Sequence, residues 1–171
     1  AIVGAGPGIS MATARRFGRE GYKIALIARR PDKLNDYISA LSEQNITAES
    51  FEADAGVIES LKSAFEQIKS KLGIVDVLIY NAAVIRQGNA STLELNPLID
   101  DFKVNVGGAL ISSQQVIPDM RVVGRGTILF TGGGLALNPY PDRAALAIGK
   151  AGLRNLAYSL GAELESEGIF V

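Results

Sequence analysis

The sequence contains no cysteine and no histidine. The absence of cysteine excludes disulfide scaffolds and thiol nucleophiles, and the absence of both excludes zinc sites of the usual nitrogen and sulfur type. Without histidine, no Ser-His-Asp or Cys-His catalytic arrangement can form. Acidic residues do not converge in the sequence, so we expect no metal site. Any chemistry must therefore use the remaining polar side chains or a bound cofactor.

An excess of charge of either sign is also missing. The chain has 17 Lys and Arg residues against 18 Asp and Glu residues, a formal net charge of -1, and the basic residues are scattered. This balance indicates neither nucleic-acid binding nor a polybasic membrane patch. No apolar run approaches the roughly 18 residues that a membrane helix needs, and no basic leader opens the chain. We expect a cytoplasmic protein, shortened at both ends because the chain starts and stops inside apolar segments.

Short apolar runs rich in Val, Ile and Leu alternate with longer helical patterns. The runs are continuous, which is typical of parallel strands buried on both faces. A length of 171 residues with 47% hydrophobic residues fits one folded domain. We therefore predict a single-domain, Rossmann-type doubly wound α/β sheet over residues 1–171. The expected strands are residues 1–4, 23–28, 47–51, 75–80, 127–131 and 169–171, and the expected helices lie near 9–21, 32–44, 56–72, 97–117 and 142–167.

A glycine-rich segment, Gly4-Ala5-Gly6-Pro7-Gly8-Ile9-Ser10, follows the first expected strand. Glycine permits a tight turn and close backbone approach, so that N–H groups and the dipole of the next helix can face a pyrophosphate. The pattern G-x-G-x-x-G fails at Ile9, whereas G-x-x-x-G-x-G fits Gly4 and Gly8, with the small Ser10 in third place. The spacing therefore selects one subclass of dinucleotide-binding loop.

Later residues fall in a matching order. Asp54 follows the third expected strand, Asn81-Ala82-Ala83 follows the fourth, and Asn105 and Lys150 lie on later helices. With the glycine segment, they make the sequence resemble the short-chain dehydrogenase/reductase family over nearly the whole chain. By residue type alone, Asp54 could equally be a turn residue, Asn81 a strand terminator and Asn105 a satisfied buried amide.

The resemblance implies a nicotinamide cofactor across the carboxyl ends of the strands, and a strand order of 3-2-1-4-5-6. The residues expected to bind this cofactor are Gly4, Gly6, Gly8, Ile9, Ser10, Arg29, Arg30, Asp54, Ala55, Asn81, Ala82, Ala83 and Lys150. Family members continue beyond the point that matches Val171 into a segment that shapes the substrate pocket. We expect that segment to lie outside this chain, so the sequence does not identify the small-molecule substrate.

Charge at the end of the second expected strand predicts which nicotinamide cofactor binds. An NAD site has an acid about 20 residues after the glycines to accept the ribose hydroxyls. This chain has Ala28-Arg29-Arg30 there. A guanidinium pairs with a 2′-phosphate in bidentate fashion, so Arg29, or Arg30, predicts that NADP(H) is preferred over NAD(H). The alternative is a solvated arginine pair at the surface.

The catalytic residues that the resemblance implies are incomplete. The family uses the tyrosine of a Y-x-x-x-K motif as proton donor, its lysine to lower the phenol pKa and hold the ribose, and a serine to bind the substrate oxygen. Lys150 is present, but Leu146 occupies the tyrosine position. The serine position falls near Gly133, or near Thr131 if the loop is shifted. Conventional carbonyl reduction would be slowed by about 3–5 kcal/mol of barrier.

Three explanations of this gap stay open. Tyr140, between two prolines, could supply a hydroxyl from its loop. A water held by Asn105 and Lys150 could deliver the proton, which makes these two the expected catalytic residues. Alternatively, the chain binds NADP(H) without catalysis, as a sensor or structural subunit. We predict an NADP(H)-dependent oxidoreductase acting on an alcohol or carbonyl group, with a non-standard proton donor.

Two of the expected helices, near 97–117 and 142–167, differ from the others because apolar residues occupy most of the helix circumference. Such a helix must be covered on more than one side, by other helices of the chain or by another subunit. We expect a homodimer or homotetramer through these helices. Asp100 and Asp101 are expected near a helix start, where acids favour the helix dipole and need no catalytic role.

Overall fold

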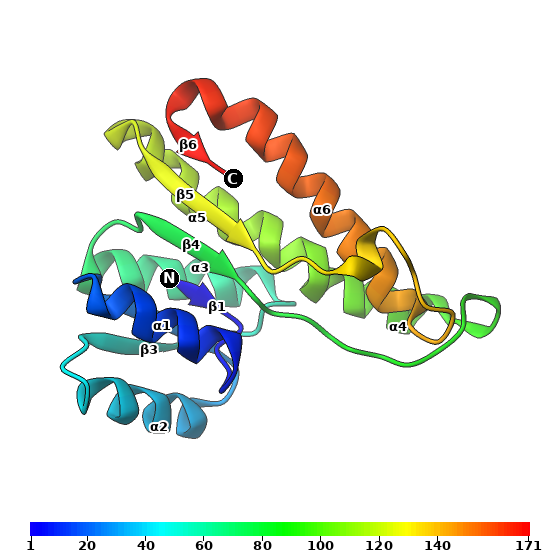
Figure 1. The fold of residues 1–171 in the computed structure, drawn as a ribbon, viewed down its shortest axis with the longest axis horizontal. Helices are drawn as coiled ribbons and strands as arrows, with labels where there is room; N and C mark the ends of the chain where they lie inside the picture. Colours follow the sequence, from blue (N-terminus) through cyan, green and yellow to red (C-terminus); the bar gives the residue numbers. More distant parts are fainter.

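The chain folds around a six-stranded parallel sheet, which the computed structural model places between two layers of helices (Figure 1). The structure describes residues 1–171, apart from the side chain of Pro31. The strand order is β3-β2-β1-β4-β5-β6 with every neighbouring pair parallel, which confirms the expected order. The strands are β1 (Ile2–Val3), β2 (Ile24–Ala28), β3 (Ala48–Glu52), β4 (Val77–Tyr80), β5 (Gly126–Phe130) and β6 (Ile169–Phe170).

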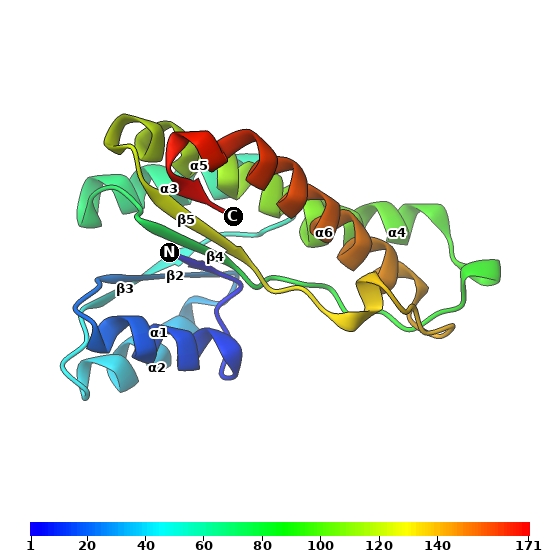
Figure 2. The ribbon, with the colours of Figure 1, turned by 45° about the horizontal axis from the view of Figure 1, so that its top comes forward.

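Six α-helices and several shorter turns connect the strands. The helices are α1 (Ile9–Arg19), α2 (Pro31–Ser42), α3 (Ile58–Leu72), α4 (Leu95–Phe102), α5 (Gly108–Val123) and α6 (Ala144–Leu164), with 3-10 turns at Ala90–Thr92, Gly134–Ala136 and Glu165–Glu167. In Figure 2, α1 and α2 lie on one side of the sheet, and α3, α5 and α6 lie on the other.

Both faces of the central strands are buried. Leu26 of β2 belongs to one core with Met11 of α1 and Leu34 of α2. The next residue, Ile27, points to the opposite face and belongs to a second core with Phe65 of α3 and Leu153 of α6. Because successive side chains of a strand alternate between faces, a strand covered on both sides needs apolar residues at every position. This is why continuous apolar runs identified the strands.

The helix expected near 97–117 is interrupted by a wider turn. A π-helical segment, Lys103–Gly107, separates α4 from α5, and the N–H of Gly108 donates to the carbonyl of Lys103, five residues back. The carbonyl of Val104, the usual acceptor of that N–H, instead accepts a hydrogen bond from the hydroxyl of Tyr80. A Cβ on Gly108 would lie 2.3 Å from the Ala55 carbonyl oxygen and from the Tyr80 hydroxyl. Glycine therefore allows the interrupted helix to approach the sheet closely.

The apolar helix expected near 142–167 is α6, and this chain covers only part of it. Leu153 and Leu164 are buried, whereas Ile148 is 43% exposed and Tyr158 is 64% exposed. Packing within the chain thus accounts for one side of the helix, and a subunit interface on the other side stays a prediction. Within the described residues, no helix is long and apolar enough to cross a membrane.

Candidate cofactor and active site

A hollow of about 210 Å³ opens at the carboxyl ends of the central strands. Strand β1 lies between β2 and β4, so the connections that leave these strands diverge at this point. Ligands of open α/β sheets bind in the crevice outside such a switch point. The predicted residues that line the hollow are Gly4, Arg29, Arg30, Asp54, Ala55, Asn81, Ala82 and Ala83. The structure therefore brings together residues that are distant in the sequence.

The three glycines of the first loop differ in what requires them. Gly4 has a φ of +85°, and a Cβ there would lie 2.4 Å from the backbone nitrogen of Ala82. Glycine is thus required by the fold itself at this position. A Cβ on Gly6 or Gly8 would meet nothing within 4 Å. The chain leaves open space beside these two residues, as a backbone that accommodates a pyrophosphate requires.

The amino end of α1 is available to an anion. Gly8 precedes the helix, no side chain caps it, and no acid lies in its first turn. The first N–H groups of a helix, here those of Ile9 and Ser10, have no acceptor within the helix. They point with the helix dipole toward the space beside Gly6 and Gly8, which suits a phosphate group. The side chain of Ile9 is 58% exposed, so it is held by few contacts within the chain.

Ser10 and Asn81 hold the glycine loop against the sheet. The buried hydroxyl of Ser10 donates to the carbonyl of Gly4 at 2.9 Å. It also accepts a hydrogen bond of 2.9 Å from the side-chain amide of Asn81, which follows β4. The same amide lies 3.4 Å from the Gly4 carbonyl. Both side chains are therefore used within the protein, and they set the position of the loop.

Asp54 lines the hollow but its carboxylate is partly used by its own loop. Oδ1 accepts the N–H of Gly56 at 2.8 Å, and the Asp54 N–H donates to the hydroxyl of Ser60 at 3.0 Å. These are the bonds of a turn residue, one of the alternatives considered for this position. The turn nevertheless places Asp54 and Ala55 at the wall of the hollow.

Basic residues gather at the end of β2. Arg29 and Arg30 are exposed and line the hollow, and no ion pair within the described part of the chain includes either of them. Lys33, in the first turn of α2, lines the same hollow, and its ammonium group lies 3.8 Å from Asp36. Lys33 is not among the residues predicted to bind the cofactor. It lies three residues after Arg30, a spacing that places two residues on one side of a helical turn.

Lys150 lies at the carboxyl end of β5. Its ammonium nitrogen donates to the carbonyl oxygen of Thr131 at 2.5 Å. Thr131 follows β5 directly, and its N–H donates to the carbonyl of Tyr80. Burial lowers the pKa of Lys150 because desolvation disfavours its charged form. The amine is thus fixed at the carboxyl end of β5, and its role beside a nicotinamide ribose stays a prediction.

The positions of the missing proton donors are apolar or empty. Leu146 is buried on α6, one helical turn before Lys150. Gly133 has extended backbone and open space around its Cα, so a serine would fit there. Tyr140 is 63% exposed, and its hydroxyl makes no hydrogen bond within the described residues. The structure therefore fixes no phenol beside Lys150.

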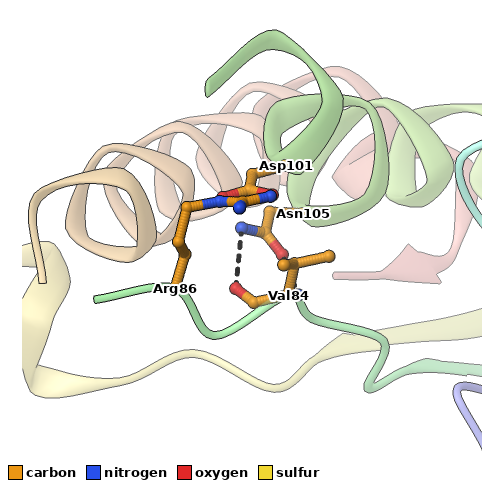
Figure 3. A network of polar contacts seen from close by, with 4 residues as sticks. All are labelled: Val84, Arg86, Asp101 and Asn105. Atoms are coloured by element: carbon orange, nitrogen blue, oxygen red, sulfur yellow. Dashed lines mark hydrogen bonds and ion pairs between the residues drawn. The ribbon is translucent and has the colours of Figure 1, made fainter. Parts of the chain in front are cut away.

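Asn105 is buried in the π-helical segment and binds the backbone of Val84. Its Oδ1 accepts the Val84 N–H at 2.7 Å. Its Nδ2 lies 3.4 Å from the Val84 carbonyl oxygen, the contact drawn as a dashed line in Figure 3. A Cβ on Gly149 would lie 2.8 Å from the Cβ of Asn105, so α6 packs directly against this amide. These contacts fit the alternative of a satisfied buried amide, and the water relay through Asn105 stays a prediction.

The prediction for Asp100 and Asp101 is wrong. Helix α4 starts at Leu95, so the two acids lie in its last turn rather than near its start, where they would favour the dipole. Asp101 is 2% exposed and forms a bidentate ion pair with Arg86 (Figure 3). No group of three or more acidic side chains in the described residues could hold a metal ion.

Comparison with known proteins gives one consistent family. A family profile described as short chain dehydrogenase matches residues 1–171. The chain is 31% identical over 168 residues to a 2,3-dihydro-2,3-dihydroxybenzoate dehydrogenase of Bacillus subtilis (strain 168), which covers 98% of this chain and 64% of that relative. The chain thus spans less than two thirds of that protein.

Solved structures agree in fold. A metagenomic short-chain oxidoreductase in complex with NADP superimposes with a TM-score of 0.93 at 28% identity, covering 99% of this chain and 77% of that one. An actinorhodin polyketide ketoreductase variant with NADPH superimposes with a TM-score of 0.95 at 26% identity, covering 99% and 66%. With the glycine loop, the switch-point hollow and the lysine at the end of β5, these matches show that the chain belongs to the short-chain dehydrogenase family.

Proposed function

We propose that this chain is the cofactor-binding part of an NADP(H)-dependent oxidoreductase that acts on an alcohol or carbonyl group. The observation that carries the proposal is the hollow at the switch point with three cations at its rim. The uncapped start of α1, which follows the glycine loop, adds a second place for a phosphate. No acid stands at the end of β2, where an NAD site would need one. The two solved relatives that hold NADP or NADPH support the same choice.

Each part of the site has a role in this proposal. The backbone at Gly6, Gly8 and Ile9 would receive the pyrophosphate, and Arg29 would pair with the 2′-phosphate. Lys150 would hold the nicotinamide ribose from the end of β5. When bound, the cofactor supplies the hydride, and the chain must supply binding, orientation and a proton. Since the side chain of Leu146 has no acidic proton to donate, the proton would come from a water beside Lys150 or from Tyr140.

A calorimetric titration of the full-length protein with NADPH and with NADH tests the cofactor assignment. We expect micromolar binding of NADPH and much weaker binding of NADH. The Arg29→Asp variant should bind NADPH at least about tenfold more weakly, because a charge-assisted hydrogen bond contributes about 1.5–3 kcal/mol and 1.4 kcal/mol is tenfold. If the ratio of the two affinities is unchanged in this variant, Arg29 is a solvated surface residue. If neither cofactor binds, the proposal fails.

The second candidate is an NADP(H)-binding protein without catalysis, and the buried Leu146 favours it. The Leu146→Tyr, Gly133→Ser double variant separates the two, since it restores both missing donors. Leu146→Phe, Gly133→Ser is the matched control, because it adds the ring without the hydroxyl. NADPH consumption is followed with a fixed panel of small ketones and aldehydes. A gain of about 10² or more in the tyrosine variant alone would indicate an intact scaffold that lacks its donors.

We also propose that the protein assembles as a homodimer or homotetramer through the helical region near 97–117 and 142–167. Phe102, Ile148 and Tyr158 lie in this region and are at least 41% exposed. Apolar side chains exposed on neighbouring helices favour an interface. Helices α4 and α6 are neighbours in this chain, since a Cβ on Gly152 would lie 3.3 Å from the ring of Phe102. One partner could therefore cover exposed side chains of both helices.

A further inference from the structure

Asp101 is a buried carboxylate to which the proposed cofactor site assigns no role. Its side chain is 3% exposed, and it lies in the last turn of α4. Its two oxygens accept hydrogen bonds from two nitrogens of Arg86, Nε to Oδ2 at 2.8 Å and Nη2 to Oδ1 at 2.9 Å. This two-pronged geometry fixes the orientation of the guanidinium as well as its distance. A pair with one partner this deeply buried is costly to break.

Arg86 belongs to the loop of residues 81–88, which follows β4 and walls the hollow with its first four residues. The loop is fixed at its start by Asn81, which binds Ser10. It is fixed at its end by Gly88, whose N–H donates to the carbonyl of Asp142 at 2.9 Å and whose carbonyl accepts the N–H of Ala144. The loop thus runs from the cofactor hollow to the first residue of α6, the helix that carries Lys150.

The middle of this loop is not held by apolar burial. Ile85 is 68% exposed, and residues 86 and 87 are also exposed. Two polar contacts hold it instead, the bond between Val84 and Asn105 and the pair between Arg86 and Asp101 (Figure 3). The first contact reaches Asn105 of the π-helical segment, and the second reaches Asp101 of α4. Loss of the ion pair would leave the loop tethered only by its ends and by Val84.

We propose that Arg86 and Asp101 are a positioning pair for the nicotinamide end of the cofactor. The proposal rests on the proposed function. The proposed function would place the 2′-phosphate at the cations near β2, whereas the loop runs from the hollow to α6, the helix that carries Lys150. Ordering the loop holds the wall of the site in the form that binds the nicotinamide half. Neither Arg86 nor Asp101 lines the hollow beside Arg29 and Arg30, where the proposed function places the adenosine half.

The test compares the whole cofactor with its adenosine half. Arg86→Met removes the guanidinium and keeps a similar side-chain length, and Arg86→Met, Asp101→Leu removes both charges, so that no buried carboxylate is left unpaired. We expect both variants to bind NADPH about tenfold more weakly, as follows if the ordered loop falls to about a tenth of the population. Binding of adenosine 2′,5′-bisphosphate should weaken less than binding of NADPH, because this ligand would meet only the first residues of the loop, which line the hollow. Arg86→Lys should not restore NADPH affinity, because an ammonium cannot form the two-pronged contact.

The control is Asp119→Asn, which removes an ion pair of 2.7 Å between α5 and Lys69 of α3, away from the hollow. It should leave both affinities unchanged. Unchanged NADPH affinity in the Arg86 variants, or an equal loss for NADPH and the bisphosphate, would overturn the proposal, since the pair would then have no role in binding or only a structural one.

Hydrogen exchange of residues 82–88 in the free protein should accelerate in the Arg86 variants but not in the control. If the unchanged protein binds no NADPH, the proposed function fails, and the exchange result alone then reports whether the pair orders the loop.

Discussion

Gly4 and Gly8 lie four residues apart in one loop, but glycine is needed at the two positions for different reasons. Gly4 has positive φ and contacts the backbone of Ala82, whereas Gly8 borders open space. We expect Gly4→Ala to lower the free energy of unfolding by about 2–4 kcal/mol, because it combines backbone strain with a clash against a rigid neighbour. Gly8→Ala should lower it by about 1 kcal/mol or less, because alanine is a poorer N-cap than glycine, yet weaken NADPH binding by filling the space beside the pyrophosphate. Urea unfolding and calorimetry measure the two effects, and equal destabilisation by both substitutions would contradict this distinction.

Lys150 should make the stability of the protein depend on alkaline pH. Burial lowers its pKa in the folded state, whereas the unfolded chain keeps the ordinary value of 10.5. Between those two values the unfolded state binds more protons than the folded state, so the free energy of unfolding rises with pH. Relative to Lys150→Met, the unchanged protein should therefore gain stability from neutral pH toward the unfolded pKa. Urea unfolding of both proteins across this range checks the sign, and a relative loss would contradict it.

At the scale of the element, the π-helical segment depends on a hydroxyl from the sheet. The hydroxyl of Tyr80 donates to the Val104 carbonyl that the wider turn frees, and burial raises the pKa of Tyr80 far above its usual value. Tyr80→Phe should lower the free energy of unfolding by about 1–3 kcal/mol, the cost of an unpaired buried acceptor. Tyr22→Phe is the control, because Tyr22 is 42% exposed and its hydroxyl makes no hydrogen bond within the described residues. Similar effects from both variants would exclude this role for Tyr80.

Elements whose identity follows from local pattern were predictable, and those that depend on long-range contacts were not. The run of Ile24–Ala28 is apolar at each position, so it indicated a strand covered on both faces. The π-helical segment leaves no such pattern, because the carbonyl that it frees, that of Val104, is paired with the hydroxyl of Tyr80, 24 residues away. The helix starts two residues earlier than predicted, at Leu95, and its α-helical part ends at Phe102, which places Asp101 in the last turn of α4.

The candidate site shows the same division. The order of Gly4, Asp54 and Asn81 predicted that they meet, since parallel strands bring their carboxyl ends to one side of the sheet, and all three line the hollow. The sequence could not tell which side chains are free to meet a ligand. Asn81 is engaged by Ser10 and Asn105 by Val84, because such bonds are made between segments that only the fold brings together. For the same reason the pair of Arg86 and Asp101 escaped notice.

At the scale of the whole molecule, the exposed apolar residues of α6 make assembly testable. Ile148 lies within the helical region predicted to form the interface, whereas Val122, at the end of α5 and 87% exposed, lies outside it. Ile148→Glu should dissociate a dimer or tetramer, because burying an unpaired carboxylate in an apolar contact is costly. Val122→Glu adds the same charge at an equally apolar side chain and should leave the assembly intact. Sedimentation velocity measures the assembly of both variants.

Helix α6 also carries Lys150. Loss of assembly in Ile148→Glu with unchanged NADPH affinity would therefore mean that each subunit binds cofactor independently. A monomeric protein without substitutions would contradict the interface.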